Sequence, residues 1–230
     1  MRRRSAIALE ICEAVLIALV LATFAKTFVV QAYQIPSGSM EQNLLIGDHI
    51  LVNKFIYGPS PSILEQALLP VRPIKRGDVV VFRFPEDPQR DFIKRCVGLP
   101  GDRVELVDKA LVVNGRPVDD TSYTYRVDPR TYPSSRFLPE AQRFRDNFGP
   151  YSVPANGYFF LGDNRDNSND SRAWQSVPNQ LIRGRAFMIY WSFEPEEQAN
   201  PSESEGGFQW SDLSVMFREI RWDRIFSIVR

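Results

Sequence analysis

The sequence has few of the residues that most often supply catalytic bases, metal ligands and disulfides. Its 230 residues include one histidine, His49, and two cysteines, Cys12 and Cys96. One cysteine lies in an apolar N-terminal segment and the other in a candidate strand, so a disulfide framework is not expected. No metal-ligand spacing is found either, and we expect neither a metal nor a cofactor.

The sequence also has no net charge, and it lacks two common hydrolase motifs. The 28 basic residues balance 28 acidic ones, so nothing indicates a nucleic-acid surface. Neither Gly-x-Ser-x-Gly nor Ser-x-x-Lys occurs. Any serine nucleophile in this chain would need an activating base, and with one histidine present lysine becomes the alternative.

The N-terminus carries a long apolar run. Three arginines at 2–4 precede residues 7–30, which would rise about 36 Å as a helix, enough to span a bilayer core. The arginines predict a cytoplasmic segment at 1–6 and a translocated remainder. Two interpretations fit: a retained transmembrane anchor at 7–30, or a signal peptide removed after the weak small-x-small site 30–32. We favour the anchor.

Beyond the apolar run the pattern is mostly β. Short runs rich in Val, Ile, Phe and Tyr, separated by Gly and Pro pairs, predict strands near 50–56, 79–84, 92–98, 103–107, 111–113, 158–161 and 187–191. Outside the N-terminus the sequence has no long helical period, although 139–148 could form a short helix. The pattern favours a mainly β, antiparallel domain.

Residues 35–40 read Ile-Pro-Ser-Gly-Ser-Met and form a candidate nucleophile turn. Pro36 fixes the entry to the turn, and Gly38 lets the backbone approach another molecule closely. Two small hydroxyl residues, Ser37 and Ser39, flank this glycine. A serine in so rigid a turn is a candidate nucleophile.

A lysine in a suitable setting lies at position 94. In a strand over 92–98, period two places Phe92, Lys94 and Cys96 on one face and Arg95 on the other. Burial on an apolar face would lower the lysine pKa towards the range of a general base. The alternative is an ordinary edge-strand lysine in water.

A third segment, Gly-Asp-Asn-Arg-Asp-Asn-Ser-Asn-Asp-Ser-Arg at 162–172, completes a pattern of three ordered motifs. Together with 35–40 and 92–102, it closely resembles the bacterial type I signal peptidases, also called leader peptidases. The resemblance covers most of 33–107 and 157–191. One departure is visible: the family usually continues after the nucleophile with Met-x-Pro-Thr-Leu, whereas this chain reads Met-Glu-Gln-Asn-Leu at 40–44.

Carried over by position, the resemblance implies roles for six residues. Ser39 would be the nucleophile and Lys94 the general base. Ser37 would join the backbone N–H of Ser39 in an oxyanion hole. Ser168 would hydrogen-bond and orient Lys94, and the supporting charge pair would be Asp170 and Arg172.

The resemblance also implies an organisation and an activity. We expect an antiparallel β catalytic domain at 31–107 and 156–230, interrupted by a small inserted subdomain at 108–155. The implied protein is a single-pass plasma-membrane enzyme, with its catalytic domain on the outer side, that removes signal peptides from exported preproteins. Its partners would be those preproteins and the lipid bilayer. Small residues would be preferred at the first and third positions before the cut.

Two other functions are weighed against this one. A self-cleaving, repressor-like Ser-Lys protein would carry a DNA-binding helical domain and no anchor, which does not fit this N-terminus. A catalytically silent, membrane-bound β module that binds exported peptides stays open.

Aromatic residues near the C-terminus allow two interpretations. They could form a rim resting on the membrane or pack in an ordinary core; they are Trp191, Trp210, Phe217, Trp222 and Phe226.

Overall fold

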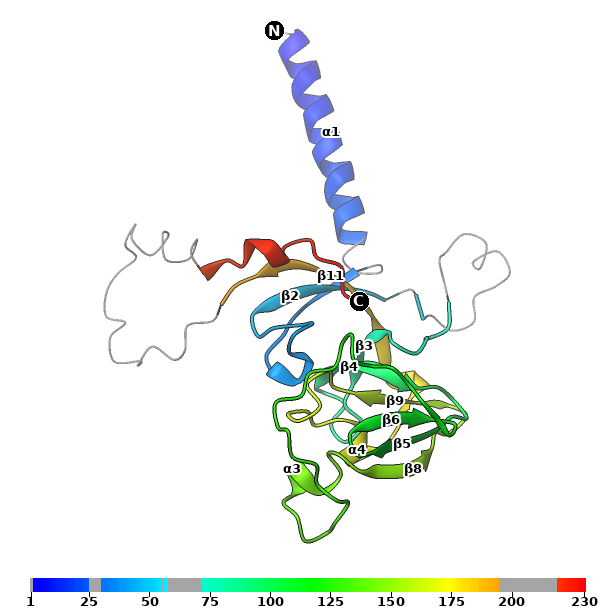
Figure 1. Ribbon diagram of the computed structural model, residues 1–230. Coiled ribbons are helices and arrows are strands. Elements are labelled where there is room, and N and C mark those ends of the chain that lie inside the picture. The colour runs from blue at the N-terminus through cyan, green and yellow to red at the C-terminus, as the bar shows by residue number, and fades with distance from the viewer. Residues whose placement is uncertain (1, 25–29, 55, 58–71, 195–218) are drawn as a thin grey trace.

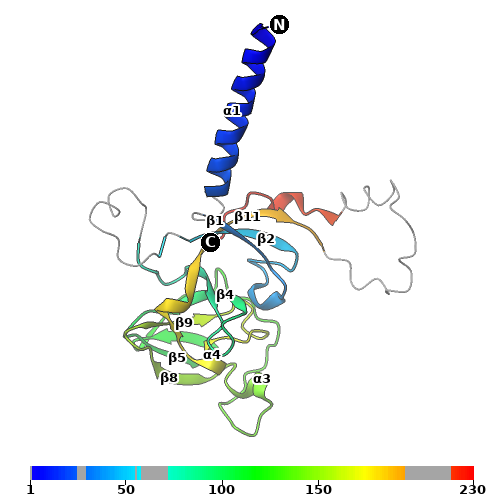
Figure 2. The same cartoon turned by 180° about the vertical axis from the view of Figure 1, so that it is seen from behind.

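The computed structural model describes residues 2–24, 30–54, 56–57, 72–194 and 219–230. An N-terminal helix, α1 (Arg2–Phe24), projects from a body made of strands (Figures 1 and 2). Its described side chains, at 10–20 and 23, are all exposed. Within the described residues, no helix has both the length and the apolar character needed to cross a membrane. The predicted anchor at 7–30 also includes residues outside the described ranges.

A seven-stranded antiparallel sheet forms the larger part of the body. Its spatial order is β1-β2-β11-β3-β4-β9-β10. The strands are β1 (Val30–Gln34), β2 (Asp48–Asn53), β3 (Val79–Arg83), β4 (Asp91–Gly98), β9 (Gly157–Leu161), β10 (Val177–Pro178) and β11 (Ile182–Ser192). Strand β11 is long enough to pair with both β2 and β3, with register shifts on each side. The sheet therefore curves around one long strand.

The burial pattern of each strand matches its place in the sheet. In β2 buried and half-buried residues alternate, as expected for a strand with one covered face. In β3 the first four residues are all buried, because this strand lies inside the sheet with both faces covered. Strand β4 lies between β3 and β9. Lys94 is therefore on an interior strand, and the edge-strand alternative is wrong.

A second, four-stranded sheet packs beside the first. Its order is β7-β6-β5-β8, and its strands are β5 (Arg103–Val107), β6 (Ala110–Val113), β7 (Arg116–Pro117) and β8 (Phe148–Ser152). The sheet begins at β5, ahead of the predicted insert at 108–155. The domain division itself stays a prediction.

The helices of the body that lie wholly within the described residues are single turns. They are η2 (Gly38–Met40), α3 (Glu140–Arg143), α4 (Ser171–Trp174), η3 (Asn179–Leu181) and η4 (Trp222–Arg224). The helix predicted at 139–148 is thus four residues long, and β8 follows it. The mainly β, antiparallel class is confirmed.

The aromatic residues near the C-terminus do not all pack in the core. Trp222 and Phe226 are 60% and 71% exposed, and Trp191 is partly exposed against Trp222, with ring centroids 6.5 Å apart. Core packing is therefore wrong for Trp222 and Phe226. Trp210 and Phe217 lie outside the described residues.

Candidate active site

A serine and a lysine meet in the interior of the larger sheet. The Nζ atom of Lys94 on β4 lies 2.7 Å from Oγ of Ser39 on η2. Both side chains are shielded from water: Lys94 is 4% exposed and Ser39 is 9% exposed. Nζ also donates to the carbonyl of Ile93 at 3.0 Å. The structure thus brings together the predicted nucleophile and the predicted base.

Burial changes the acidity of this lysine. Removal from water lowers the pKa of Lys94 from 10.5 to about 8. The charges of Asp170 and Asp163 oppose that shift, and the charge of Arg172 reinforces it. At pH 7 about one lysine in ten is then neutral, roughly 300-fold more than at the ordinary pKa. A neutral amine beside a hydroxyl can take the hydroxyl proton, the arrangement of serine hydrolases that use lysine as the base.

Apolar residues fix the turn that carries Ser39. Ile35, Met40 and Leu44 are buried in the core cluster below β2 and β11. The backbone of Ile35 is bonded on both sides, since its N–H donates to Asp48 at 2.8 Å and its carbonyl accepts from Gly47 at 3.1 Å. The turn is therefore anchored at both ends, which positions the serine between them.

Ser37 lies beside the nucleophile, as predicted. Its Oγ is 3.4 Å from Oγ of Ser39, and the Ser37 side chain is exposed. A hydroxyl at this position is close enough to donate a hydrogen bond to a substrate oxygen held at Ser39.

The loop at 162–170 closes the other side of the site. The N–H of Asn164 donates to the carbonyl of Ser39 at 3.1 Å. A Cβ atom on Gly162 would lie 2.5 Å from that same carbonyl oxygen and would also collide with Ser168. Only glycine allows this approach. The predicted motif contained Gly162, but sequence reasoning gave it no role.

The predicted supporting pair is present and buried. Asp170 accepts from Nε and Nη2 of Arg172 at 2.8 and 2.7 Å, and also from the N–H of Gly162 at 3.1 Å. Burial alone would raise the pKa of Asp170, but the charge and hydrogen bonds of Arg172 outweigh it and the pKa is lowered. Asp170 is therefore a carboxylate at neutral pH.

The predicted hydrogen bond between Ser168 and Lys94 is not formed. Lys94 bonds to Ser39 and to Ile93, whereas the buried Ser168 hydroxyl has no well-formed hydrogen bond within the described part of the chain. Ser168 lies against Gly162 and close to the Asp170 carboxylate, whose pKa it helps to lower. It belongs to the wall of the site, and its role as a lysine-orienting residue stays a prediction.

Sequence reasoning missed a second buried cation next to Lys94. Arg95 donates to both carboxylate oxygens of Asp163, at 2.7 and 2.6 Å, and its guanidinium lies 4.3 Å from the ring centroid of Tyr123. Strand period placed Arg95 on the opposite face from Lys94 but did not show that this face is buried. Asp163 lies in the third motif, so the pair links two of the motifs.

The departure from the family pattern also has a structural role. Asn43 donates through Nδ2 to Asp163 at 2.8 Å and to the carbonyl of Tyr123 at 2.9 Å. The carboxylate of Glu41 accepts from Nδ2 of Asn164 at 3.0 Å. The contacts with Asp163 and Asn164 tie the nucleophile turn to the loop at 162–170.

The single histidine lies in another environment. His49 on β2 contacts the rings of Tyr190 and Phe193, with centroids 5.9 and 5.7 Å away. The hydrogen bonds of Lys94, in contrast, go to Ser39 and Ile93. The basic side chain in contact with the Ser39 hydroxyl is thus a lysine.

Comparison with known proteins identifies the family. The family model described as signal peptidase, peptidase S26, matches residues 8–191. A signal peptidase I of Pseudomonas fluorescens is 40% identical over 207 residues, covering 79% of this chain and 72% of that protein. A signal peptidase I of Pseudomonas aeruginosa is 39% identical over 197 residues, covering 76% and 69%. The chain belongs to the signal peptidase family, S26, and is a peptidase.

A solved structure is also similar to this chain. A signal peptidase I from Enterococcus faecalis aligns at 28% identity with a TM-score of 0.37, covering 50% of this chain and 97% of that one.

Proposed function

We propose that the protein is a membrane-anchored serine endopeptidase that removes signal peptides from exported preproteins through a Ser-Lys acyl-enzyme mechanism. The observation that carries the proposal is the buried 2.7 Å contact between Lys94 Nζ and Ser39 Oγ. The family supplies the substrate class, since members are named signal peptidases.

The reaction begins with neutral Lys94. Its amine takes the proton of Ser39 while Oγ attacks the carbonyl carbon of the scissile peptide bond. The oxyanion that forms is stabilised by the Ser39 N–H and the Ser37 hydroxyl, at roughly 3–4 kcal/mol per donor. The protonated lysine then gives its proton to the leaving amine, and the acyl-enzyme remains.

Deacylation uses the same base. Neutral Lys94 takes a proton from water, the resulting hydroxide attacks the acyl carbon, and the proton returns to Ser39 as the ester bond breaks. Arg172 and Asp170 support the loop behind this site, and Ser168 is proposed to orient the amine during the cycle.

The proposed location is the plasma membrane, with the N-terminus in the cytoplasm and the β body outside. Arg2–Arg4 followed by the apolar run at 7–30 supports a retained anchor in that orientation. Exposed apolar side chains on α1 support contact with lipid, and so do the exposed Trp222 and Phe226 of the C-terminal segment, which lies on the same side of the body as α1 (Figures 1 and 2).

Thiol labelling in intact cells tests the location. After Cys12→Ser, a cysteine introduced by Ser5→Cys is expected to resist a membrane-impermeant reagent, and one introduced by Ser134→Cys, at an exposed position of the body, is expected to react. Cys96 is buried and serves as an unreactive background. The reverse pattern would place the β body in the cytoplasm and contradict the proposal.

Turnover separates the enzyme from the silent peptide-binding module. Full-length protein in neutral detergent is incubated with a mixed panel of preproteins, and cleavage sites are read by mass spectrometry. We expect catalytic release of signal peptides by the wild type and none by Ser39→Ala. Stoichiometric binding without cleavage would favour the module.

A further inference from the structure

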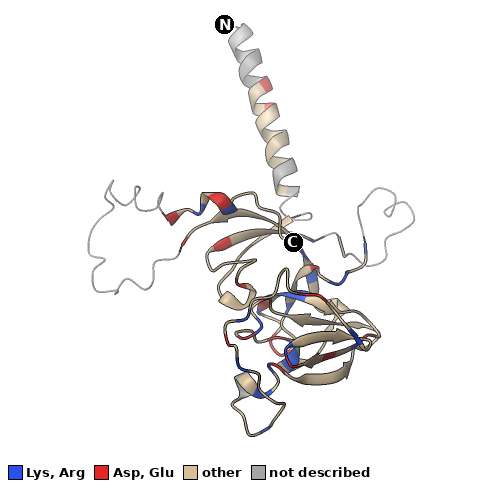
Figure 3. Cartoon of the chain, in the orientation of Figure 1, with Lys and Arg blue, Asp and Glu red and all other residues tan. Residues whose placement is uncertain are grey.

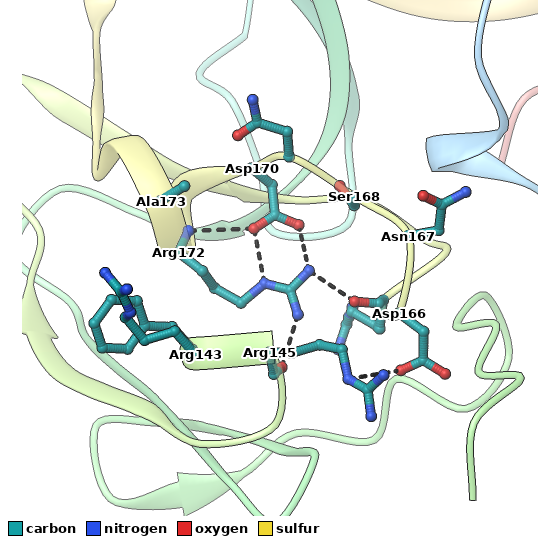
Figure 4. Close-up of a pocket in the computed structure, with 11 residues that line it drawn as sticks. Arg143, Arg145, Asp166, Asn167, Ser168, Asp170, Arg172 and Ala173 are labelled. Carbon is teal, nitrogen blue, oxygen red and sulfur yellow. Dashed lines mark hydrogen bonds and ion pairs between the residues drawn. The ribbon is translucent and has the colours of Figure 1, made fainter. Parts of the chain in front are cut away.

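A pocket is lined in part by the loop that carries Ser168 and Asp170. Its volume is about 650 Å³, within the range of small-molecule sites. Residues 143–145, at the end of α3, form one wall, and residues from 165 to 173, which lead into α4 and include its start, form the other (Figure 4). Four of the lining residues are arginines: Arg143, Arg145, Arg165 and Arg172.

The charges around this pocket do not balance. Six basic side chains form ion pairs with only five aspartates; the basic residues are Lys109, Arg126, Arg130, Arg145, Arg165 and Arg172, and the acids are Asp120, Asp128, Asp146, Asp166 and Asp170. Arg143 adds a further positive charge and has no carboxylate partner among the described residues. Figure 3 shows how densely basic and acidic residues gather in this part of the body. The surplus is positive.

Buried donors in the same walls lack acceptors. Nε of Arg143 and Nη2 of Arg165 are both buried and have no hydrogen-bond partner in the described part of the chain. The Arg165 side chain is 4% exposed, and its other contacts are an ion pair with Asp120 at 2.6 Å and a bond to the carbonyl of Gly162 at 3.2 Å. An unsatisfied buried donor destabilises the fold, because it has lost its hydrogen bonds to water without gaining new ones. Oxygen acceptors entering the pocket would remove that cost.

We propose that this pocket binds a water-soluble organic anion with a phosphate or carboxylate group. Guanidinium groups are the donors best matched to such planar or tetrahedral oxyanions. Arg143 is the principal contact, because its charge is otherwise uncompensated. Phe144, partly exposed in the same wall, supplies an apolar surface for the rest of the ligand.

The position of the pocket favours a dissolved ligand over a lipid headgroup. Both α3 and α4 lie in the lower part of the body, whereas α1 leaves from the opposite end (Figures 1 and 2). A bilayer that holds α1 would be remote from the pocket. The pocket shares Ser168, Asp170 and Arg172 with the wall of the active site, but neither Ser39 nor Lys94 lines it, so the inference stands whether or not the proposed peptidase mechanism holds.

Binding of phenyl phosphate tests the proposal. Full-length protein in neutral detergent is titrated at constant ionic strength, and binding is followed by calorimetry. Arg143→Gln removes one positive charge of the surplus, and Arg116→Gln, at an exposed position of β7, is the matched control. We expect saturable binding by the wild type, at least about a tenfold loss in Arg143→Gln because a charge-assisted hydrogen bond is removed, and less than a twofold change in Arg116→Gln.

Two results would overturn the inference. One is the absence of saturable binding. The other is equal weakening in both variants, since that is the result of non-specific attraction to net charge. A second arm measures retention on vesicles with and without phosphatidylglycerol; loss of retention confined to Arg143→Gln, without phenyl phosphate binding, would assign the pocket to a lipid headgroup and contradict the proposal. Thermal unfolding confirms that both variants are folded.

Discussion

Lys94 and Arg95 are neighbours on one interior strand, and both are buried. They lie on opposite faces of β4, and only Arg95 has a carboxylate as its hydrogen-bond partner. On one face lies Arg95, which is 2% exposed. Two of its guanidinium nitrogens donate to the Asp163 carboxylate, and the ring of Tyr123 lies beside the guanidinium. On the other face Lys94 has a hydroxyl and a backbone carbonyl. No carboxylate in the described part of the chain forms an ion pair with it.

The difference shows how one strand can hold both a structural and a reactive cation. A buried arginine stays charged, so it requires a partner such as Asp163. A buried lysine can lose its proton instead, and the missing carboxylate lowers the cost of doing so. Asp170 and Asp163 act on Lys94 only at a distance, where they limit the fall of its pKa to about 8.

The largest expected effect tests the reactive side. Ser39→Ala or Lys94→Ala should each lower kcat/KM for preprotein cleavage by at least about 10³-fold, because each removes one half of a unit that acts together. The double variant should be no worse than either single one. Circular dichroism checks the fold. Retention of more than about a tenth of the activity in Lys94→Ala would refute the base assignment.

Arg95→Met tests the structural side. It leaves the Asp163 carboxylate buried without its cation, so we expect a loss of about 3–5 kcal/mol in the free energy of unfolding at pH 7. Urea unfolding measures it. Arg116→Met, on the exposed strand β7, is the control and should change stability little. A loss below about 1 kcal/mol would mean that the pair is not needed for the fold.

Lys94→Met should change the free energy of unfolding in the opposite direction from Arg95→Met. A folded-state pKa lowered to about 8 penalises the native state below pH 8, and stability recovers as pH rises from about 8 to 10.5. Removing the lysine should therefore stabilise the fold at pH 7, by about 3 kcal/mol, and abolish the recovery. Urea unfolding at pH 7 and pH 10 gives both quantities. If Lys94→Met destabilised the protein at pH 7, the lysine would not carry a burial penalty.

The rate of preprotein cleavage should depend on the same loss of a proton from Lys94. We expect kcat/KM to rise about tenfold per pH unit below an apparent pKa near 8, so that activity at pH 6 is about 100-fold below the plateau. Stopped assays from pH 5 to 9 measure the profile. A flat profile over this range would exclude lysine as the base.

The smallest expected effect concerns the hydrogen bond between Asn43, in the nucleophile turn, and Asp163, the partner of Arg95. Asn43→Ala removes a hydrogen bond to Asp163 and loosens the nucleophile turn, so kcat should fall by about tenfold with little change in KM. Asn43→Asp should be worse, because it places a second carboxylate against Asp163. Gln42→Asn, at an exposed neighbouring position, is the control. Equal activity in all three variants would remove Asn43 from the positioning network.

Local pattern predicted much of this arrangement. The run at 103–107 is a strand with those bounds, and period two placed Lys94 and Arg95 on opposite faces of β4. Three motifs marked the site because their residue types are required by its chemistry. What the pattern could not predict depends on pairing across long sequence separations. Arg95 is buried against Asp163, 68 residues away in the sequence, and Asn43 binds the same Asp163 across 120 residues. The missing bond between Ser168 and Lys94 is likewise a matter of side-chain geometry.

The C-terminal segment also holds the nucleophile turn. Arg224 donates to the carbonyl of Asn43 at 2.9 Å and forms an ion pair with Asp48, while Val229 is part of the core cluster below the turn. The contact between Arg224 and Asn43 spans 181 positions. During synthesis the turn therefore has no brace on this side until residues near 224 have left the ribosome. The braced turn can therefore form only after all the strands of the body have been synthesised, and for a peptidase this order links the completed site to the folding of the whole β body.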